Sequence, residues 1–337
     1  MITNVIQDLV DRKDLTEIEA GAVMGEIMSG AASDPQVAAF LTALRMKGET
    51  SDELVGFARV MRERALPLWD GDPMEVLDTC GTGGDRSGTF NISTAAAFVA
   101  AGAGARVAKH GNRSISSRSG SADVLESLGV DIQMSPEMLR RAIREVGIGF
   151  LFAQSFHSSM KHVMPARRAI KVRTVFNFLG PLANPANACF QVIGVNSFSI
   201  LELMATALAR LGAQHAFVVH GEGGLDEIAL SGPSHVIEVK DGALHHMSVK
   251  PSDFGVSSAP LDAIRGGDPD ENAVIIRDVL AGKAGPHRDA VLINAAAAVT
   301  AAGLANDLPS GFEVAAEAID SGRALEKLEG LKALSDS

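Results

Sequence analysis

Cysteine is scarce in this sequence: among 337 residues, only Cys80 and Cys189 carry a thiol. The two lie far apart, form no CxxC pair and match no spacing of metal ligands, which argues against a disulfide-stabilised fold and a cysteine metal site. The sequence also lacks a signal peptide and an apolar run long enough to cross a membrane. We therefore expect a cytoplasmic protein without a membrane partner.

Positive charge is scarce as well, since the formal net charge is −11. Nucleic-acid binding relies on a broad basic surface, so nucleic acid is not expected to be the main partner. One segment differs: between Arg106 and Arg118 the chain carries arginines, a lysine and a histidine but no acid. A short basic segment on an acidic protein suits a small anionic ligand. A solvated surface loop explains the same charges equally well.

What the sequence does contain is typical of a globular protein, with 46% hydrophobic and 21% charged residues. Its first seventy residues have the pattern of short helices. Thr16–Glu19 and Thr50–Glu53 have the capping-box spacing of a hydroxyl and a glutamate three residues apart, and Ser33 precedes a proline near a helix start. So few short helices cannot bury a core alone. They are expected to pack on the rest of the chain or on a second copy of it.

After a turn-rich break at 66–73, short apolar strands alternate with helices. This alternation predicts an α/β fold: a small all-helical domain plus a larger α/β domain with a mostly parallel central sheet flanked by helices. In such sheets, ligands bind where loops leave the carboxyl ends of the strands. Strands are predicted at 76–78, 105–109, 149–153, 189–194 and 216–220, an extended segment at 130–133, and helices at 92–101, 121–128, 136–146 and 201–211.

A glycine-rich loop, Asp78–Asp85, is followed by Thr89–Thr94 at the start of a predicted helix. Glycines let the backbone approach an anion closely, and the amino end of a helix adds a favourable dipole. The combination predicts a phosphate site, although tight turns alone also require glycine. It matches neither the Walker pattern nor the dinucleotide-binding fingerprint.

A second motif joins Lys109–Arg113 to a serine-rich run at 116–121. Lys109, at the end of a predicted strand, can act as a point charge for pyrophosphate, and the serines can donate hydrogen bonds to its oxygens. His110 is either a general acid or base or a hydrogen-bonded structural residue, of which the second is commoner.

The third motif, His220–Glu227, leaves a predicted strand through glycines and ends in two adjacent carboxylates, Asp226 and Glu227. Magnesium prefers oxygen ligands and often shares its shell with waters and substrate phosphates. An exposed acidic turn is the alternative interpretation of the same residues.

Together these motifs resemble the anthranilate phosphoribosyltransferases, glycosyltransferases of tryptophan biosynthesis whose fold is similar to that of the pyrimidine nucleoside phosphorylases. The resemblance implies transfer of the 5-phosphoribosyl group from phosphoribosyl pyrophosphate to the amine of anthranilate, with magnesium, giving N-(5-phosphoribosyl)anthranilate and pyrophosphate. The segments that carry it are Gly81–Asp85, Asn91–Thr94, Lys109–Arg113, Ser119–Asp123, Arg173–Asn177, Leu179–Pro185 and Gly223–Glu227.

The resemblance also implies roles for individual residues. Lys109, Asn112 and Arg167 are the implied catalytic residues; Gly81, Asn112 and Arg167 would face anthranilate, with Arg167 on its carboxylate. Ser93, Asp226 and Glu227 would hold magnesium. The implied substrate-binding set is Gly81, Gly84, Asp85, Thr89, Asn91, Ile92, Ser93, Thr94, Lys109, His110, Gly111, Asn112, Arg113, Ser114, Ile115, Ser116, Ser117, Ser121 and Arg167.

The implied domains are a helical one at 1–72, completed by about 165–185, and an α/β one at 73–164 and 186–337 that binds phosphoribosyl pyrophosphate. A hinged closure between them and a homodimer formed through the helices are also expected. The sequence departs from the family pattern at His157–Lys161, where Ser-Ser replaces the usual Pro-Ala, and at Ile170-Lys171, where Leu-Gly is usual.

Two other functions compete with this expectation. One is a pyrimidine nucleoside phosphorylase-like enzyme, which would use phosphate on the same fold. The other is a nucleic-acid-binding homologue that reuses the basic segment. The intact pair of Asp226 and Glu227 argues against pure binding, which needs no magnesium site.

Overall fold

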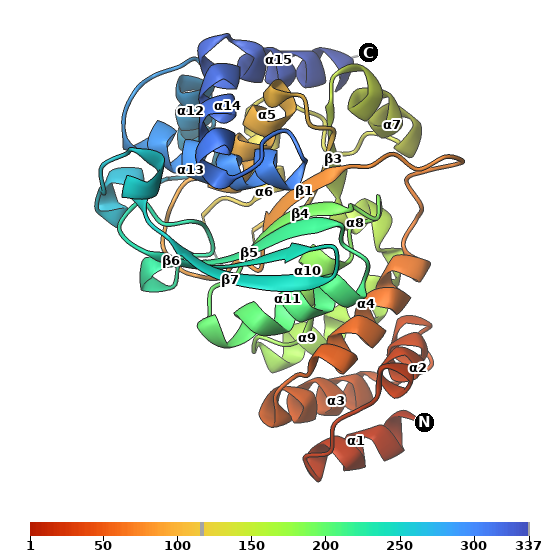
Figure 1. Cartoon of the computed structure of the whole chain (residues 1–337). Coiled ribbons are helices and arrows are strands. Elements are labelled where there is room, and N and C mark those ends of the chain that lie inside the picture. Colours follow the sequence, from red (N-terminus) through yellow and green to blue (C-terminus); the bar gives the residue numbers. More distant parts are fainter. Residues whose placement is uncertain (115–117, 336–337) are drawn as a thin grey trace.

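The computed structural model describes residues 1–114 and 118–335. Its amino-terminal part is a layer of four helices, drawn in red and orange in Figure 1. Three of them begin where the sequence predicts, because the hydroxyls of Thr16 and Thr50 accept the amides of Glu19 and Glu53, and Ser33 precedes the third. The helices are α1 (Ile2–Val10), α2 (Glu17–Met28), α3 (Asp34–Lys47) and α4 (Ser51–Arg64).

The remainder of the chain is built on a seven-stranded sheet, counted over the described ranges, with strand order β3-β2-β1-β4-β5-β6-β7. The first five strands in this order run parallel, whereas β6 and β7 are antiparallel. The predicted mostly parallel sheet is thus confirmed. The strands are β1 (Leu77–Gly81), β2 (Val107–Gly111), β3 (Ile148–Phe152), β4 (Phe190–Gly194), β5 (His215–Gly221), β6 (Ser234–Lys240) and β7 (Ala243–Val249).

Helices cover both faces of the sheet, as Figure 1 shows. On one face lie the buried alanine-rich helices α5 (Ile92–Ala103) and α13 (Pro286–Ala301). On the other, α10 and α11 separate the sheet from the four amino-terminal helices. The remaining helices are α6 (Ser121–Ser127), α7 (Pro136–Glu145), α8 (Ala153–Phe156), α9 (Met164–Ile170), α10 (Phe176–Leu182), α11 (Leu201–Arg210), α12 (Pro269–Leu280), α14 (Leu308–Asp320) and α15 (Arg323–Ser335).

Each face of the sheet belongs to a different apolar core. Along β5, Phe217 packs into one core and Val218 into the other, as the alternation of side chains along a strand requires. The second core also contains Phe40 of α3 and Phe57 of α4. The four amino-terminal helices therefore share one apolar core with α10, α11 and this face of the sheet.

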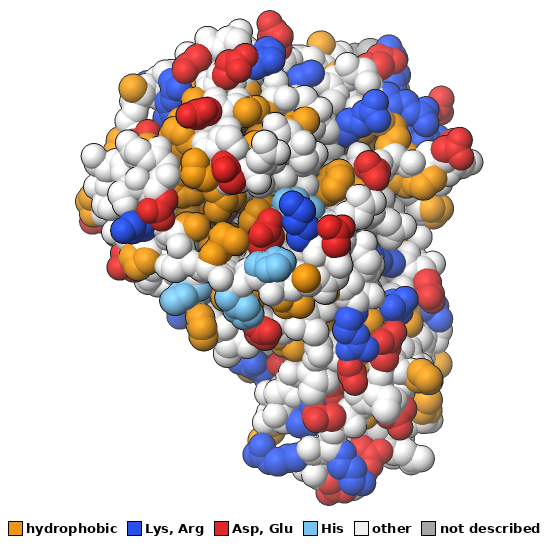
Figure 2. Space-filling view, viewed as in Figure 1, with side chains coloured by type: hydrophobic (Ala, Val, Ile, Leu, Met, Phe, Trp, Pro, Cys, Tyr) orange, Lys and Arg blue, Asp and Glu red, His pale blue; other side chains and the backbone are white. Residues whose placement is uncertain are grey.

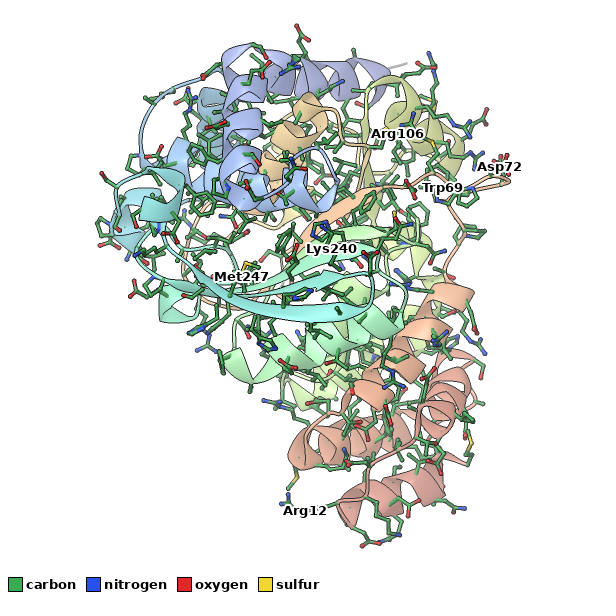
Figure 3. The ribbon with its side chains drawn as sticks, in the orientation of Figure 1. Arg12, Trp69, Asp72, Arg106, Lys240 and Met247 are labelled. Atoms are coloured by element: carbon green, nitrogen blue, oxygen red, sulfur yellow. The ribbon has the colours of Figure 1, made fainter. Side chains whose placement is uncertain are left out.

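Two hydrogen bonds join α4 and the connection after it to the end of α10 and the segment that follows it. Arg62 of α4 donates from Nε to the carbonyl of Leu182 at 2.7 Å. Trp69, in the connection from α4 to β1, donates from Nε1 to the carbonyl of Ala186 at 3.0 Å. Figure 3 labels Trp69 and Asp72 on this connection, far from Arg12 at the other end of the molecule.

The sequence-based expectations fail in two places. The predicted extended segment at 130–133 is wrong: the chain makes a turn there, and its apolar alternation arises because Val130 and Ile132 both insert into the core without pairing. The hairpin of β6 and β7 was not predicted, although its turn, Asp241-Gly242, has the positive φ values of 49° and 79° that this dipeptide favours. No helix in the part of the chain described is both long and apolar enough to span a membrane.

Candidate active site

The glycine loop and the acidic pair meet because their strands lie side by side. Strand β4 separates β1 from β5, all three run parallel, and Gly81 is in register with Gly194. The chain after β5 passes directly over β4 at that point: a Cβ atom at Gly194 would lie 1.6 Å from the carbonyl oxygen of Asp226. Glycine at 194 therefore permits the close approach that brings Asp226 to the glycine loop.

Hydrogen bonds to both the N–H and the carbonyl of Gly83 hold the glycine loop in place. Its N–H donates to Oδ2 of Asp226 at 2.9 Å. Its carbonyl accepts hydrogen bonds from Nδ2 of Asn196 at 2.7 Å and from Nη2 of Arg173 at 2.9 Å. Gly83 and Gly84 adopt φ values of 65° and 76°, which residues with a side chain rarely adopt. The loop conformation thus depends on its glycines and on three distant segments.

Three carboxylates gather beside this loop. Burial and the adjacent charge of Asp85 raise the pKa of Asp226 to about 7. Burial, and then the charge of Asp226, also raise the pKa of Glu227 well above its usual range. One carboxylate oxygen of Asp85 is buried and has no hydrogen-bond partner among the described residues. Closely spaced, poorly compensated carboxylates of this kind are suited to a cation.

The start of α5 faces the same carboxylates. The N–H of Ser93 donates to Oε1 of Glu227 at 3.1 Å. Nζ of Lys109 lies 3.4 Å from Oγ of Ser93 and donates to the carbonyl of Thr79. Lys109 is only 3% exposed, and this burial lowers its pKa. The structure therefore places Ser93, Lys109 and Glu227 in one cluster behind the loop.

Beneath Lys109 lies a fully buried carboxylate, Asp78 of β1. It accepts hydrogen bonds from Nδ2 of Asn184 at 2.8 Å and from the N–H of His110 at 3.0 Å. Burial raises the pKa of Asp78, whereas Lys109 opposes that change. Asp78 and Asn184 lie within quoted motifs, but sequence reasoning assigned neither a role; here they tie β1, β2 and the segment after α10 together.

The loop after β2 is anchored mainly by the helix that follows it. Oδ2 of Asp123 accepts the N–H groups of Ser114 and Gly120 at 3.0 and 2.9 Å. Arg113 forms ion pairs with Asp123 and Glu126. The basic segment of the sequence is thus divided, since Lys109 is buried and Arg113 is paired. Ile115, Ser116 and Ser117 lie outside the described residues.

Asn91 links this loop to α5 and α12. It donates from Nδ2 to the carbonyl of Ser119 at 3.2 Å, and its Oδ1 accepts from Oγ of Ser119 at 3.1 Å and from Nδ2 of Asn272 at 2.9 Å. Asn272 is a buried residue that sequence reasoning missed. No local pattern could have pointed to it, because it lies 181 residues from Asn91.

His110 lies against a second histidine. Its Nδ1 is 3.1 Å from the carbonyl of Gly180, and its ring centroid is 5.2 Å from that of His157. Burial, followed by the nearby His157, lowers the pKa of His110 to about 3. A neutral and enclosed imidazole favours the structural interpretation of His110 over general acid–base catalysis.

The two residues expected at anthranilate lie on different elements. Oδ1 of Asn112 accepts from Nε2 of Gln154 at 3.2 Å. The guanidinium of Arg167, on α9, lies 5.5 Å from the ring centroid of Phe176. Lys171 ends α9 in the left-handed conformation with a φ of 52°, which glycine adopts more readily. The departure at Ile170-Lys171 therefore still allows a normal helix end next to Arg167.

The other residues of the expected set lie around the same strand ends. A Cβ at Gly81 would lie 2.8 Å from Oδ2 of Asp226, and one at Gly111 would lie 2.2 Å from Oγ of Ser121. Ile92 and Thr94 are buried in the first turn of α5, and Thr89 forms an isolated bridge with Arg265.

Comparison with known proteins places this geometry in a family. Residues 3–65 match the family model described as "Glycosyl transferase family, helical bundle domain", and residues 74–325 match "Glycosyl transferase family, a/b domain". The anthranilate phosphoribosyltransferase of Chloroflexus aggregans is 55% identical over 336 residues, covering 99% of this chain and 98% of the relative. That of Symbiobacterium thermophilum is 54% identical over 328 residues, covering 97% and 96%. The chain belongs to the anthranilate phosphoribosyltransferase family.

Solved structures of anthranilate phosphoribosyltransferases have the same fold. That from Thermus thermophilus matches with a TM-score of 0.92 and 47% identity, covering 98% of this chain and 99% of that one. The enzyme from Saccharomyces cerevisiae in complex with phosphoribosyl pyrophosphate and magnesium matches with a TM-score of 0.90 and 30% identity, covering 99% and 98%. The predicted family, the two-part architecture and the α/β class are thereby confirmed.

Proposed function

We propose that this anthranilate phosphoribosyltransferase transfers the 5-phosphoribosyl group from phosphoribosyl pyrophosphate to the amine of anthranilate. The products are N-(5-phosphoribosyl)anthranilate, an intermediate of tryptophan biosynthesis, and pyrophosphate. The observation that carries the proposal is the meeting of the glycine loop, the start of α5 and the pair of Asp226 and Glu227 at the carboxyl ends of the central strands, in a chain that belongs to this family.

Magnesium fits this site as an ion that the protein and the substrate bind together. Over the described residues, no three His, Cys, Asp or Glu side chains are arranged to hold a metal by themselves. Magnesium often takes one or two carboxylates and completes its shell with water and substrate phosphates. Asp226 and Glu227, with the hydroxyl of Ser93, would supply the protein ligands. When bound, the ion would neutralise charge that develops on the departing pyrophosphate.

The chain's own groups would hold and orient the donor substrate. Backbone N–H groups of the glycine loop and of the first turn of α5 are suited to phosphate oxygens. The charge of Lys109 would act on the same side, from its position behind Ser93 and Glu227. Because the amine of anthranilate is already nucleophilic, positioning and stabilisation of the leaving group would supply most of the rate acceleration.

On the acceptor side, we propose that Arg167 binds the carboxylate of anthranilate, together with Asn112 and Gly81. The guanidinium of Arg167 packs on Phe176 and has no carboxylate within ion-pair distance in the described ranges. A planar guanidinium offers two parallel donors to a carboxylate. This supports an anionic acceptor at α9.

We further propose a homodimer formed through the helical domain, residues 1–72 completed by 165–185. Several large apolar side chains of this domain remain exposed: Val10, Ile18 and Met46 are 62%, 84% and 72% accessible. Val175 and Phe176 share a buried core with α1 to α4, which supports the domain boundary. Light scattering at micromolar concentration should give twice the 35.1 kDa chain mass. A monomer would contradict the proposal.

We also propose that the protein is cytoplasmic and that it does not bind nucleic acid. The two free thiols, Cys80 and Cys189, suit the reducing cytoplasm. Acidic and basic side chains are interspersed over the face drawn in Figure 2, where histidines gather over β6 and β7. A mixed surface on a chain of net charge −11 supports the absence of a nucleic-acid partner.

One assay tests the function directly. Anthranilate fluorescence should fall when the protein, phosphoribosyl pyrophosphate and magnesium are all present, and should persist when either the donor or the metal is omitted. Unchanged fluorescence in the complete mixture, with release of free base from thymidine or uridine in phosphate, would instead establish the nucleoside phosphorylase alternative.

A further inference from the structure

Arg173 reaches the glycine loop from the segment between α9 and α10. Its Nη2 donates to the carbonyls of Gly83 at 2.9 Å and Thr82 at 3.4 Å. Its Nη1 lies so close to Gly84 that a Cβ atom there would be only 1.6 Å away. Gly84 therefore serves a second purpose besides its positive φ, because any side chain at this position would displace the guanidinium.

The contact with Arg173 determines how the Gly83 residue is oriented. The N–H of Gly83 points at Asp226, while its carbonyl is held by Arg173 and by Asn196. Backbone groups that are hydrogen-bonded on both sides have little freedom to rotate. Removing the guanidinium would leave the 2.7 Å bond from Asn196 as the remaining side-chain hold on that carbonyl.

Among the described residues, the charge of Arg173 forms no ion pair. Within the described ranges, no carboxylate lies within ion-pair distance of its guanidinium, although Asp226 and Asp85 are in its surroundings together with Arg45 and Arg86. The side chain is half-buried on backbone carbonyls. Guanidinium groups in such surroundings usually pair with a carboxylate or phosphate. Arg173 instead donates to two backbone carbonyls of the glycine loop, and these contacts indicate that it orders the loop.

We infer that Arg173 is a positioning residue for phosphoribosyl pyrophosphate, which acts by holding the carbonyls of Thr82 and Gly83 and so fixes the conformation of the glycine loop. This inference rests on the proposed function. Arg173 also lies six residues after Arg167 on one continuous segment, so it connects the acceptor side of the site to the donor loop. Its loss should impair use of the donor and spare the binding of anthranilate.

The test compares Arg173→Gln and Arg173→Lys with Arg168→Gln, which removes the same charge from an exposed position on α9. Three quantities are measured: kcat and KM for each substrate, calorimetric binding of magnesium pyrophosphate, and amide hydrogen exchange of the peptide that covers 82–88. Arg173→Gln should raise KM for phosphoribosyl pyrophosphate about tenfold or more and change that for anthranilate less than about twofold. It should also weaken pyrophosphate binding and speed exchange in the loop.

Arg173→Lys should restore part of the donor KM, because an ammonium group can reach one carbonyl but cannot reproduce the fork. Arg168→Gln should match the wild type in all three measurements. Loop exchange that stays unchanged in Arg173→Gln would overturn the inference, as would a rise confined to the anthranilate KM. Failure of the wild type to form product would refute the proposed function instead, and the exchange comparison would still decide whether Arg173 orders the loop.

Discussion

The two loops that border the site are held in opposite ways. The glycine loop after β1 is fixed by residues 90, 113 and 143 positions away, namely Arg173, Asn196 and Asp226. The loop after β2 is anchored at Ser114 and Arg113 by Asp123 and Glu126, only 9 to 13 residues away. The shape of the first loop therefore depends on contacts with segments far away in the sequence. The second is shaped largely by its own helix.

This difference has a practical consequence for mutations. A change in a distant segment should disturb the glycine loop, and with it the donor site, without affecting the loop after β2. A change in α6 should do the reverse. Variants of the two loops and of the side chains around them can test whether this distinction holds.

The largest effect is expected from replacing both Asp226 and Glu227 with alanine. The change removes the acceptors of the Gly83 and Ser93 amides together with the proposed magnesium ligands. We expect kcat/KM to fall about a hundredfold or more and the magnesium requirement to rise. The measurement is a magnesium titration of the initial rate. An unchanged magnesium dependence in this double variant would remove both residues from the site.

Substitution of Arg167 should affect mainly the use of anthranilate, and substitution of Lys109 mainly the use of phosphoribosyl pyrophosphate. Arg167→Ala should raise KM for anthranilate about ten- to a hundredfold, since a charge-assisted pair contributes roughly 1.5–3 kcal/mol. Lys109→Ala should instead weaken use of phosphoribosyl pyrophosphate and slow departure of the leaving group. Steady-state kinetics with each substrate varied in turn gives both values.

Arg168→Ala is the control for this pair, because its side chain is exposed on the same helix. Loss of anthranilate use in Arg168→Ala but not in Arg167→Ala would shift the assignment by one residue. If neither variant affects anthranilate, α9 does not bind the acceptor.

Asp123→Ala tests the locally held loop. It removes the acceptor of two backbone N–H groups, so unfolding in urea should show a loss of about 2 to 3 kcal/mol. Hydrogen exchange should increase in the loop after β2 and stay unchanged at 82–88. Faster exchange in both loops would show that the two are coupled. Asp131→Ala, which removes one bond to Gln133, serves as the control.

The smallest expected effect is on the pH dependence of the free energy of unfolding. Burial lowers the pKa of His157 to about 4 from 6.5, so below about pH 6.5 the unfolded chain takes up a proton that the folded protein does not. The folded protein therefore keeps its full free energy of unfolding above about pH 6.5 and loses part of it as the pH falls toward 4. At pH 5 this loss amounts to roughly 2 kcal/mol relative to pH 7. His157→Gln should reduce the difference in unfolding free energy between the two pH values; an equal difference would place the acid sensitivity elsewhere.

Sequence reasoning succeeds here where structure is set locally. The hydroxyl–glutamate spacings at Thr16 and Thr50 locate two helix starts, because the partners are one turn apart. The hairpin of β6 and β7 is an exception: its turn, Asp241-Gly242, is a local signal too, yet the sequence analysis predicts no hairpin there. The motifs around Gly83 and Asp226 could be quoted from the sequence, since the resemblance to a family supplied them.

The contacts between those motifs could not be predicted in the same way. Arg173 stands in a matching segment without a predicted role, because its partner, the carbonyl of Gly83, lies 90 residues away and meets it only in the folded chain. Asn196 and Asn272 carry no local signal at all. Their importance follows from distances that exist only in the folded chain.

The sequence contains a single tryptophan and no tyrosine. That one indole, Trp69, lies on the connection between α4 and β1 and donates to the carbonyl of Ala186, on the segment that returns from α10 to β4. The near-ultraviolet spectrum of the protein therefore comes mainly from one chromophore at the joint between the helical layer and the sheet. Its emission is an unlabelled optical reporter of that joint, read at wavelengths where few other side chains contribute.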